Sequence, residues 1–208
     1  MPLILDGQPL SIQDLLGVAR DNTPVAVGPR AMALMSASRA VVEAALGDGL
    51  PHYGINTGFG SLSRQRIAPQ DLRTLQRNLV RSHAAGVGAP LPADVVRGTM
   101  LLLAASLCRG HSGARPLLAE SLVAMLNADI TPVVPETGSV GASGDLAPLS
   151  HIALALIGEG EVDHAGRRTT AAAALAAHAI TPVVLEAKEG LALINGTHLM
   201  ATLGALAC

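Results

Sequence analysis

A serine flanked by small residues stands in a glycine-rich loop that leads directly into an apolar segment. Three glycines fall between Gly138 and Gly144, so the backbone there can adopt conformations closed to other residues. Asp145 is a typical N-cap residue, and the apolar pattern of residues 146–157 predicts a buried helix. Ser143 is therefore expected beside a helix N-terminus, where free N–H groups and the positive end of the dipole favour an anion or an electrophile.

Two familiar kinds of catalytic loop do not fit this stretch. A hydrolase nucleophile elbow requires Gly-x-Ser-x-Gly, and the last position here is Asp145. A phosphate-binding loop ends in Gly-Lys-Ser/Thr, which does not follow. From the residues alone, a plain turn before a helix remains the other interpretation.

A second glycine-rich stretch runs from His52 to Gly60 and holds the only tyrosine and the only phenylalanine of the chain. Its glycines do not follow Gly-x-Gly-x-x-Gly, and no strand pattern precedes them, so a dinucleotide site is not predicted. The aromatic side chains could simply anchor a surface loop. For Tyr53 to act as a base at neutral pH, positive groups or helix N-termini would have to face its phenol.

Three segments resemble the aromatic amino acid ammonia-lyase family. They are Ala142-Ser143-Gly144-Asp145-Leu146, Tyr53-Gly54-Ile55-Asn56-Thr57-Gly58-Phe59-Gly60 and Glu189-Gly190-Leu191-Ala192-Leu193-Ile194-Asn195-Gly196-Thr197. In that family Ala-Ser-Gly cyclises and loses water to become 4-methylideneimidazole-5-one (MIO), a built-in electrophile, and no external cofactor is needed. The resemblance implies that the nitrogen of Gly144 attacks the carbonyl of Ala142, and that Ser143 supplies the methylidene carbon.

The same resemblance implies roles for residues outside the triad. Tyr53 would take the β-proton of the substrate, and Gly60, in the same motif, would lie at the substrate. Asn195 would bind near the electrophile and the polar end of the amino acid, where an amide offers both donors and an acceptor. Ser82-His83 resembles the histidine-selective enzymes, since phenylalanine enzymes tend to have Phe-Leu there and tyrosine enzymes His-Leu. His83 would therefore lie near the imidazole ring.

The activity implied is the elimination of ammonia from L-histidine to give trans-urocanate, the first step of histidine degradation. Whether the methylidene carbon takes the substrate amine or is attacked by the ring is left open. A tyrosine or phenylalanine ammonia-lyase or aminomutase is the alternative within the family. His198 leaves room for it, because histidine lyases usually carry glutamine there, and this residue either alters substrate fit or merely packs.

The composition predicts a helical protein with an aliphatic core. Hydrophobic residues make up 50% of the 208 residues and charged residues only 14%, with no tryptophan. A core of alanine, leucine, valine and isoleucine suits closely packed helices. Periodicity and capping residues predict helices at 12–20, 29–46, 69–83, 94–107, 114–127, 146–157, 170–178 and 199–208.

Strands are few in this prediction. Short strands are expected at 3–5 and 25–27, and an exposed hairpin or turn at 159–168. The resemblance implies a mainly α fold, the N-terminal MIO-bearing domain of the ammonia-lyase (fumarase/aspartase-like helical) fold.

Residues 1–208 would then be the MIO-containing domain and the start of the central helical bundle. Because the apolar helix predicted at 199–208 stops without a polar finish, we expect a fragment that lacks the C-terminal remainder of the fold. Family active sites are shared among the subunits of a homotetramer. A truncated helical module that only assembles is therefore the third functional alternative.

Charge, hydropathy and the placement of cysteines and histidines exclude several classes of partner and of bound metal. The net charge of −2 predicts neither nucleic acid nor an anionic membrane surface as partner. We see no signal peptide and no apolar run of about 20 residues, so a cytoplasmic protein is expected. Two cysteines do not make a disulfide framework. No metal site is predicted, because the usual ligand spacing is missing among His52, His83, His111 and His151.

Overall fold

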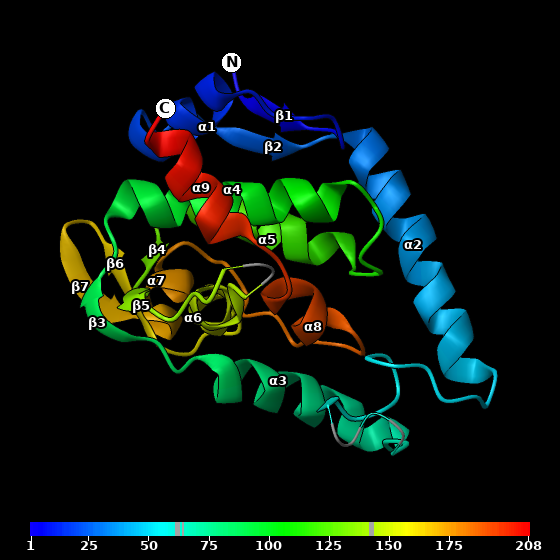
Figure 1. The fold of residues 1–208 in the computed structure, drawn as a ribbon. Coiled ribbons are helices and arrows are strands. Elements are labelled where there is room, and N and C mark those ends of the chain that lie inside the picture. Colours follow the sequence, from blue (N-terminus) through cyan, green and yellow to red (C-terminus); the bar gives the residue numbers. More distant parts are fainter. Residues whose placement is uncertain (61–62, 64, 142–143) are drawn as a thin grey trace.

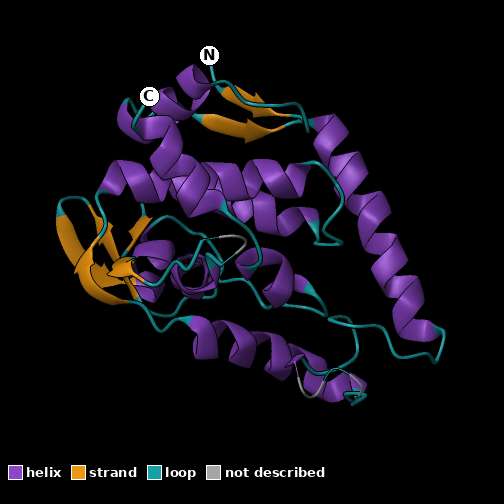
Figure 2. Cartoon of the chain, in the orientation of Figure 1, coloured by secondary structure: helices purple, strands orange, loops and turns teal. Residues whose placement is uncertain are grey.

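The computed structural model describes residues 1–60, 63, 65–141 and 144–208, and helices dominate it (Figure 1, Figure 2). At the N-terminus, β1 (Leu3–Leu5) pairs in parallel with β2 (Val25–Val27), and α1 (Ile12–Arg20) connects them. A capping box starts α1: the Asp14 N–H donates to the Ser11 hydroxyl at 3.1 Å, and the Ser11 N–H donates to the Asp14 carboxylate at 2.9 Å. These predicted elements are confirmed.

The centre of the fold is a pair of apolar helices, α4 (Ala93–Cys108) and α5 (Pro116–Asn127). Helices α1, α2 (Pro29–Gly47) and α9 (His198–Leu206) pack around α4. The core is aliphatic, as predicted, and its largest fully buried side chains are leucine, methionine and isoleucine. The predicted start of α5 at Ala114 is wrong, because Pro116 occupies the first helical position.

A second group of helices, α3 (Leu72–His83), α6 (Leu146–Leu156) and α8 (Glu189–Ile194), pack against one another. In Figure 1, α6 and α8 lie between α3 and the α4–α5 pair. The predicted helix from Pro69 is split, since η2 (Pro69–Asp71) is a single 3₁₀ turn before α3. Helix α8 was not predicted as a helix, because six residues are too short to show helical periodicity.

Two small sheets complete the fold (Figure 2). In one, β3 (Val87–Pro90) and β5 (Pro135–Thr137) are antiparallel, and neither strand was predicted. In the other, β4 (Thr131–Pro132), β6 (Glu161–His164) and β7 (Arg167–Thr170) are antiparallel in the order β4-β6-β7, and the predicted hairpin is confirmed. Helix α7 (Ala171–Ala177) follows this sheet and packs on β6 and β7. Among the helices of the described ranges, none has the length and apolar character needed to cross a bilayer.

The two cysteines are not bonded to each other. Cys108 is buried in the α4 core and Cys208 is exposed. Burial raises the pKa of the Cys108 thiol to about 11, so this thiol stays protonated and unreactive at neutral pH.

Candidate active site

The loop before α6 folds back on itself where the cyclising triad was predicted. The Gly144 N–H donates to the Gly141 carbonyl at 2.6 Å, and the Val140 N–H donates to the Gly144 carbonyl at 3.0 Å. A Cβ at position 144 would collide with the Val140 side chain and would lie 2.5 Å from the Gly141 oxygen. Only glycine fits this turn. Ala142 and Ser143, the other two residues of the predicted triad, lie outside the described residues.

Asp145 ties this loop to the start of α9. Its side chain is fully buried, and it accepts hydrogen bonds from the Ser139 hydroxyl at 2.5 Å and from the Met200 N–H at 3.0 Å. Its own N–H donates to the Gly196 carbonyl at 3.3 Å. Asp145 is the N-cap of α6 by position, as predicted, but its carboxylate caps the first turn of α9 instead. The loop and the Asn195-Gly196 turn are therefore neighbours.

Asn195 is the exposed residue that ends α8. The imidazole of His198 packs directly on Gly196, next to Asn195, and leaves no room for a side chain there. Burial lowers the pKa of His198, and the nearby Asp145 carboxylate opposes that shift. His198 thus forms part of the wall behind the Asn195 turn.

The start of α8 is fixed by groups from distant parts of the chain. Glu189 is fully buried, and its carboxylate accepts hydrogen bonds from the Arg115 guanidinium at 2.6 and 2.8 Å. The Gln76 side-chain oxygen accepts the Gly190 N–H at 2.8 Å. Because α8 has only six residues, these contacts set the position of Asn195 at its end.

Two positively charged side chains also fix the segment that leads into α8. Arg39 is buried and donates to the Ala187 carbonyl at 2.9 Å. Lys188 has a left-handed backbone, with a φ of 72°, and its ammonium donates to the Ser112 carbonyl at 2.7 Å. Burial lowers the pKa of Lys188. The segment before Asn195 is thus held by charged side chains rather than by apolar packing alone.

His83 is the last residue of α3. Its ring nitrogen Nδ1 lies 2.9 Å from the Leu79 carbonyl, which can only accept, so Nδ1 carries the proton and donates. This leaves Nε2 with its lone pair for a ligand. The next turn is tied to α6, since the Gly86 N–H donates to His151 Nε2 at 3.2 Å. Burial lowers the pKa of His151, which keeps its imidazole neutral and able to accept.

Tyr53 lies in a loop against α8. Its side chain is 60% exposed and stacks edge-on with Phe59, with ring centroids 6.2 Å apart. Gly54 has a φ of 72°, and a Cβ there would lie 2.6 Å from the Leu191 side chain, so this loop touches α8 closely. Gly60 is exposed and has a φ of 56°.

The structure brings the segments of the predicted site together, but the predicted side chains make no hydrogen bond to one another within the described ranges. Asp145 contacts Gly196, beside Asn195. Gly138 packs on Gly86, three residues after His83. The Tyr53 loop reaches α8 through the close approach of Gly54 to Leu191.

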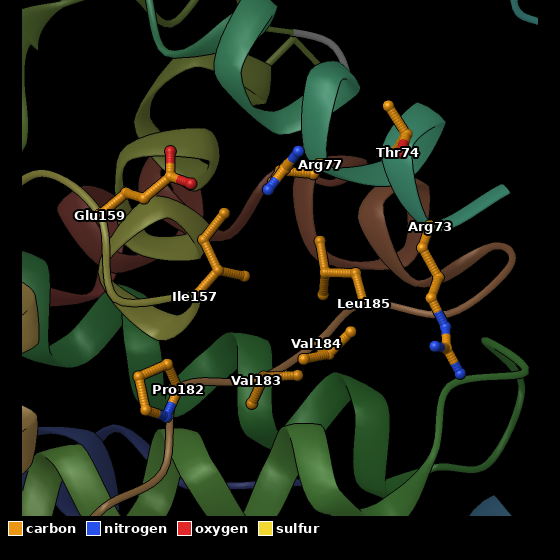
Figure 3. Close-up of a pocket in the computed structure, with 9 residues that line it drawn as sticks. All are labelled: Arg73, Thr74, Arg77, Ile157, Glu159, Pro182, Val183, Val184 and Leu185. Atoms are coloured by element: carbon orange, nitrogen blue, oxygen red, sulfur yellow. The ribbon is translucent and has the colours of Figure 1, made fainter. Parts of the chain in front are cut away.

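A well-formed pocket lies elsewhere. It has a volume of about 260 Å³ and opens between α3, the end of α6 and residues 182–185 (Figure 3). Apolar side chains, including Ile157 and Leu185, line it together with Arg73, Arg77 and Glu159. None of the predicted site residues lines this pocket, and we do not assign it to the site.

The sequence did not reveal which residues position the segments of the site through hydrogen bonds. Asp145 was recognisable as a capping residue, but its partner Met200 is 55 positions away and gives no local signal. Gln76 reads as a polar position on an amphipathic helix and is in fact buried under α8. His151 was interpreted as a helix-wall residue, and its hydrogen bond to Gly86 supports that interpretation.

Comparisons with known proteins agree with this picture. Residues 10–208 match the aromatic amino acid lyase family. A histidine ammonia-lyase of Stigmatella aurantiaca is 52% identical over 204 residues, which cover 98% of this chain and 40% of that protein. A histidine ammonia-lyase structure from Trypanosoma cruzi superposes with a TM-score of 0.92 at 40% identity, covering 100% of this chain and 40% of that one.

A tyrosine aminomutase structure from Streptomyces globisporus superposes with a TM-score of 0.91 at 41% identity, covering 99% of this chain and 39% of that one. The chain spans about 40% of the length of the curated relatives that it matches. The match to the family extends over nearly every residue, from the first helix to the last. This chain therefore belongs to the aromatic amino acid lyase family.

Proposed function

We propose that this chain is the electrophile-bearing part of a histidine ammonia-lyase, which eliminates ammonia from L-histidine to give trans-urocanate. The observation that carries the proposal is the pair of backbone hydrogen bonds that join Gly144 to Val140 and Gly141, at a position that only glycine can fill. It falls in the segment where the family forms its electrophile, in a chain about half identical to curated histidine ammonia-lyases.

The residues present fit an MIO group. Its formation requires the nitrogen of Gly144 to approach the Ala142 carbonyl, and the hydrogen bond from the Gly144 N–H to the Gly141 oxygen holds this nitrogen next to the residue that precedes Ala142. The buried carboxylate of Asp145 holds the downstream end of the turn. Once formed from Ala142, Ser143 and Gly144, the group would supply an electrophilic carbon that turns the substrate amine into a better leaving group.

The other residues have separate tasks in this proposal. Tyr53, in its phenolate form, accepts the β-proton on its oxygen while the C–N bond breaks and a C=C bond forms, so that ammonia leaves and the proton stays on the enzyme as the phenol hydrogen. The free Nε2 of His83 accepts the N–H of the substrate imidazole. Asn195 binds the polar end of the amino acid. Gly60 lies at the substrate and, having no side chain, leaves space for it.

The 60% exposure of Tyr53 suits a site that other parts of an assembly complete. We therefore also propose a homotetramer with shared sites, acting in the cytoplasm. Residues 1–208 would contribute the MIO-containing domain and the start of the helical bundle.

A tyrosine or phenylalanine enzyme is the second candidate, because the tyrosine aminomutase structure is as similar as the histidine ammonia-lyase one. The Ser82-His83 pair, with its free Nε2, favours histidine. Supplying histidine, tyrosine and phenylalanine and following urocanate, coumarate and cinnamate by absorbance separates these possibilities. Formation of coumarate or cinnamate alone would replace histidine as the substrate.

Intact mass tests the electrophile itself. The purified chain should be lighter than its encoded sequence by two water molecules. The Ser143→Ala variant should lack this full loss, whereas Ser139→Ala, a serine of the same loop, should keep it. An unmodified wild-type mass together with no turnover of any of the three amino acids would contradict the proposal that this chain is enzymatically active and would leave the inactive helical module as the alternative.

A further inference from the structure

One histidine of a peripheral hairpin and one at the end of the next helix meet at their ring nitrogens. His164 ends β6, and His178 follows α7, so the hairpin and the helix are joined there (Figure 1). Their Nε2 atoms lie 3.2 Å apart, and the rings are nearly perpendicular, with centroids 4.8 Å apart. Neither residue belongs to the candidate active site.

The separation suits a shared metal ion. Two imidazole nitrogens that bind one tetrahedral zinc ion, each at about 2.0–2.1 Å, lie about 3.3 Å from each other. The 3.2 Å between His164 and His178 is close to this value. Both nitrogens could therefore reach one ion with little movement of either ring.

A second contact orients the His164 ring. Its Nδ1 lies 3.3 Å from the Asp129 carbonyl, which can only accept, so Nδ1 carries the proton. This tautomer leaves the Nε2 lone pair on the side facing His178. Metal-binding histidines in proteins are commonly fixed in this way, by a carbonyl on the other ring nitrogen.

The surroundings let a hydrated ion approach. His164 is half-buried and His178 is exposed, and a hollow of about 400 Å³ opens beside His164 between β7 and α7. Of the two nearby arginines, Arg168 is paired with Asp163 at 3.2 Å. Arg167 lies opposite His164 in the hairpin and opposes a cation, but it is exposed and its field is screened by salt.

We propose that His164 and His178 form a binding site for one borderline divalent transition-metal ion, of the Zn²⁺, Ni²⁺ or Cu²⁺ class. Imidazole ligands suit these metals. No group of three potential metal-binding side chains occurs within the described ranges, so water fills the other positions of the ion. The ion joins the hairpin to the end of α7. Without metal, the same two rings share an N–H···N hydrogen bond.

Calorimetric titration of the untagged protein with Zn²⁺ tests the site. We expect one ion per chain, bound at least about tenfold more weakly by His178→Ala, since even the loss of an outer-shell partner weakens metal binding 10- to 100-fold. His111→Ala, which removes an exposed histidine elsewhere, is the matched control and should bind as the wild type does. Equal Zn²⁺ affinity in the wild type and His178→Ala, or no binding at all, would overturn the proposal.

Spectroscopy with Cu²⁺ identifies the ligands independently of affinity. The electron paramagnetic resonance spectrum of the wild type should show two coordinating nitrogens, and that of His164→Ala only one. Zn²⁺ should also slow amide exchange in residues 161–170 of the wild type but not of this variant, because the ion joins the hairpin to the end of α7. A spectrum unchanged by His164→Ala would place the ion elsewhere and contradict the site.

Discussion

Two segments that carry predicted site residues are held in opposite ways. Residues 186–195, which lead to Asn195, are fixed by side chains from remote parts of the chain, among them Arg39, Gln76 and Arg115. Residues 51–60, which carry Tyr53, are held mainly by hydrogen bonds to residues nearby in sequence, among them Asp48, Gln65 and Ile67. In that loop the Asn56 side chain accepts the His52 N–H at 2.6 Å and donates to the Leu50 carbonyl at 2.8 Å.

The difference separates two kinds of positioning. The place of Asn195 depends on the whole helical core, because its anchors span more than 70 residues of sequence. The Tyr53 loop is a local unit that touches the core closely at Gly54 and Leu191. We therefore expect mutations of the first set of anchors to lower global stability, and mutations of the second set to act mainly on the loop.

The largest effect is expected from Arg115→Met. It leaves the fully buried Glu189 carboxylate without its cation, and breaking a buried ion pair typically lowers the free energy of unfolding by about 3–5 kcal/mol. Urea unfolding followed by circular dichroism measures the change. Arg168→Met breaks an exposed pair with Asp163 and should change stability little. Equal effects of the two substitutions would contradict the idea that α8 is fixed by buried charge.

Asp145→Ala tests whether the loop before α6 belongs with the remotely anchored segment. The change removes the buried acceptor of the Met200 N–H and the Ser139 hydroxyl, and should lower the free energy of unfolding by about 2–3 kcal/mol. Ser139→Ala removes only one of these bonds and should lower it by about 1 kcal/mol. If Asp145→Ala unfolds at the same urea concentration as the wild type, the loop is held locally.

Gly54→Ala tests the main contact of the Tyr53 loop with the core. The added methyl group meets Leu191 in a left-handed conformation, so we expect a loss of about 2 kcal/mol. Gly49 has a similar φ of 81° with open space around it, so Gly49→Ala should lower the free energy of unfolding by only about 1 kcal/mol. In the background of Leu191→Ala, Gly54→Ala should no longer cause the extra loss of stability that comes from the contact with Leu191. The same loss in both single variants would mean that the Leu191 contact carries no strain.

The smallest effect is a pH dependence at the His83 turn. Burial lowers the pKa of His151 in the folded chain, so its contribution to stability is complete above the unfolded-state pKa of about 6.5 and is lost as pH falls through the lower folded value. On acidification the free energy of unfolding should therefore fall more steeply for the wild type than for His151→Gln. The two slopes should differ by at most the uptake of one proton, which is about 1.4 kcal/mol per pH unit. Parallel pH profiles would show that His151 titrates alike in both states.

The elements of this fold could largely be predicted from sequence, because their signals are local. The capping box at Ser11 and the proline at position 29 identify helix starts within a few residues. Helix α8 and the β3–β5 pair could not be predicted, since both are short and depend on partners far along the chain.

The same division applies to the candidate site. Motif resemblance identified Tyr53, His83, Asn195 and the triad, and these roles remain predictions. The motifs did not reveal the contacts that hold these residues in place. The bond from Asp145 to Met200 and the buried pair of Glu189 with Arg115 join positions at least 55 residues apart, and only the folded chain brings them together.

The stacking of Tyr53 on Phe59 gives the protein a built-in optical probe. Tyr53 is the only tyrosine, the chain has no tryptophan, and phenylalanine emits only weakly, so nearly all of its ultraviolet fluorescence comes from one ring in the candidate active site. Anything that covers this 60% exposed side chain, whether an amino acid or a second subunit, will change that emission without any label. The lack of aromatic residues elsewhere, which follows from the aliphatic core, makes the signal free of background.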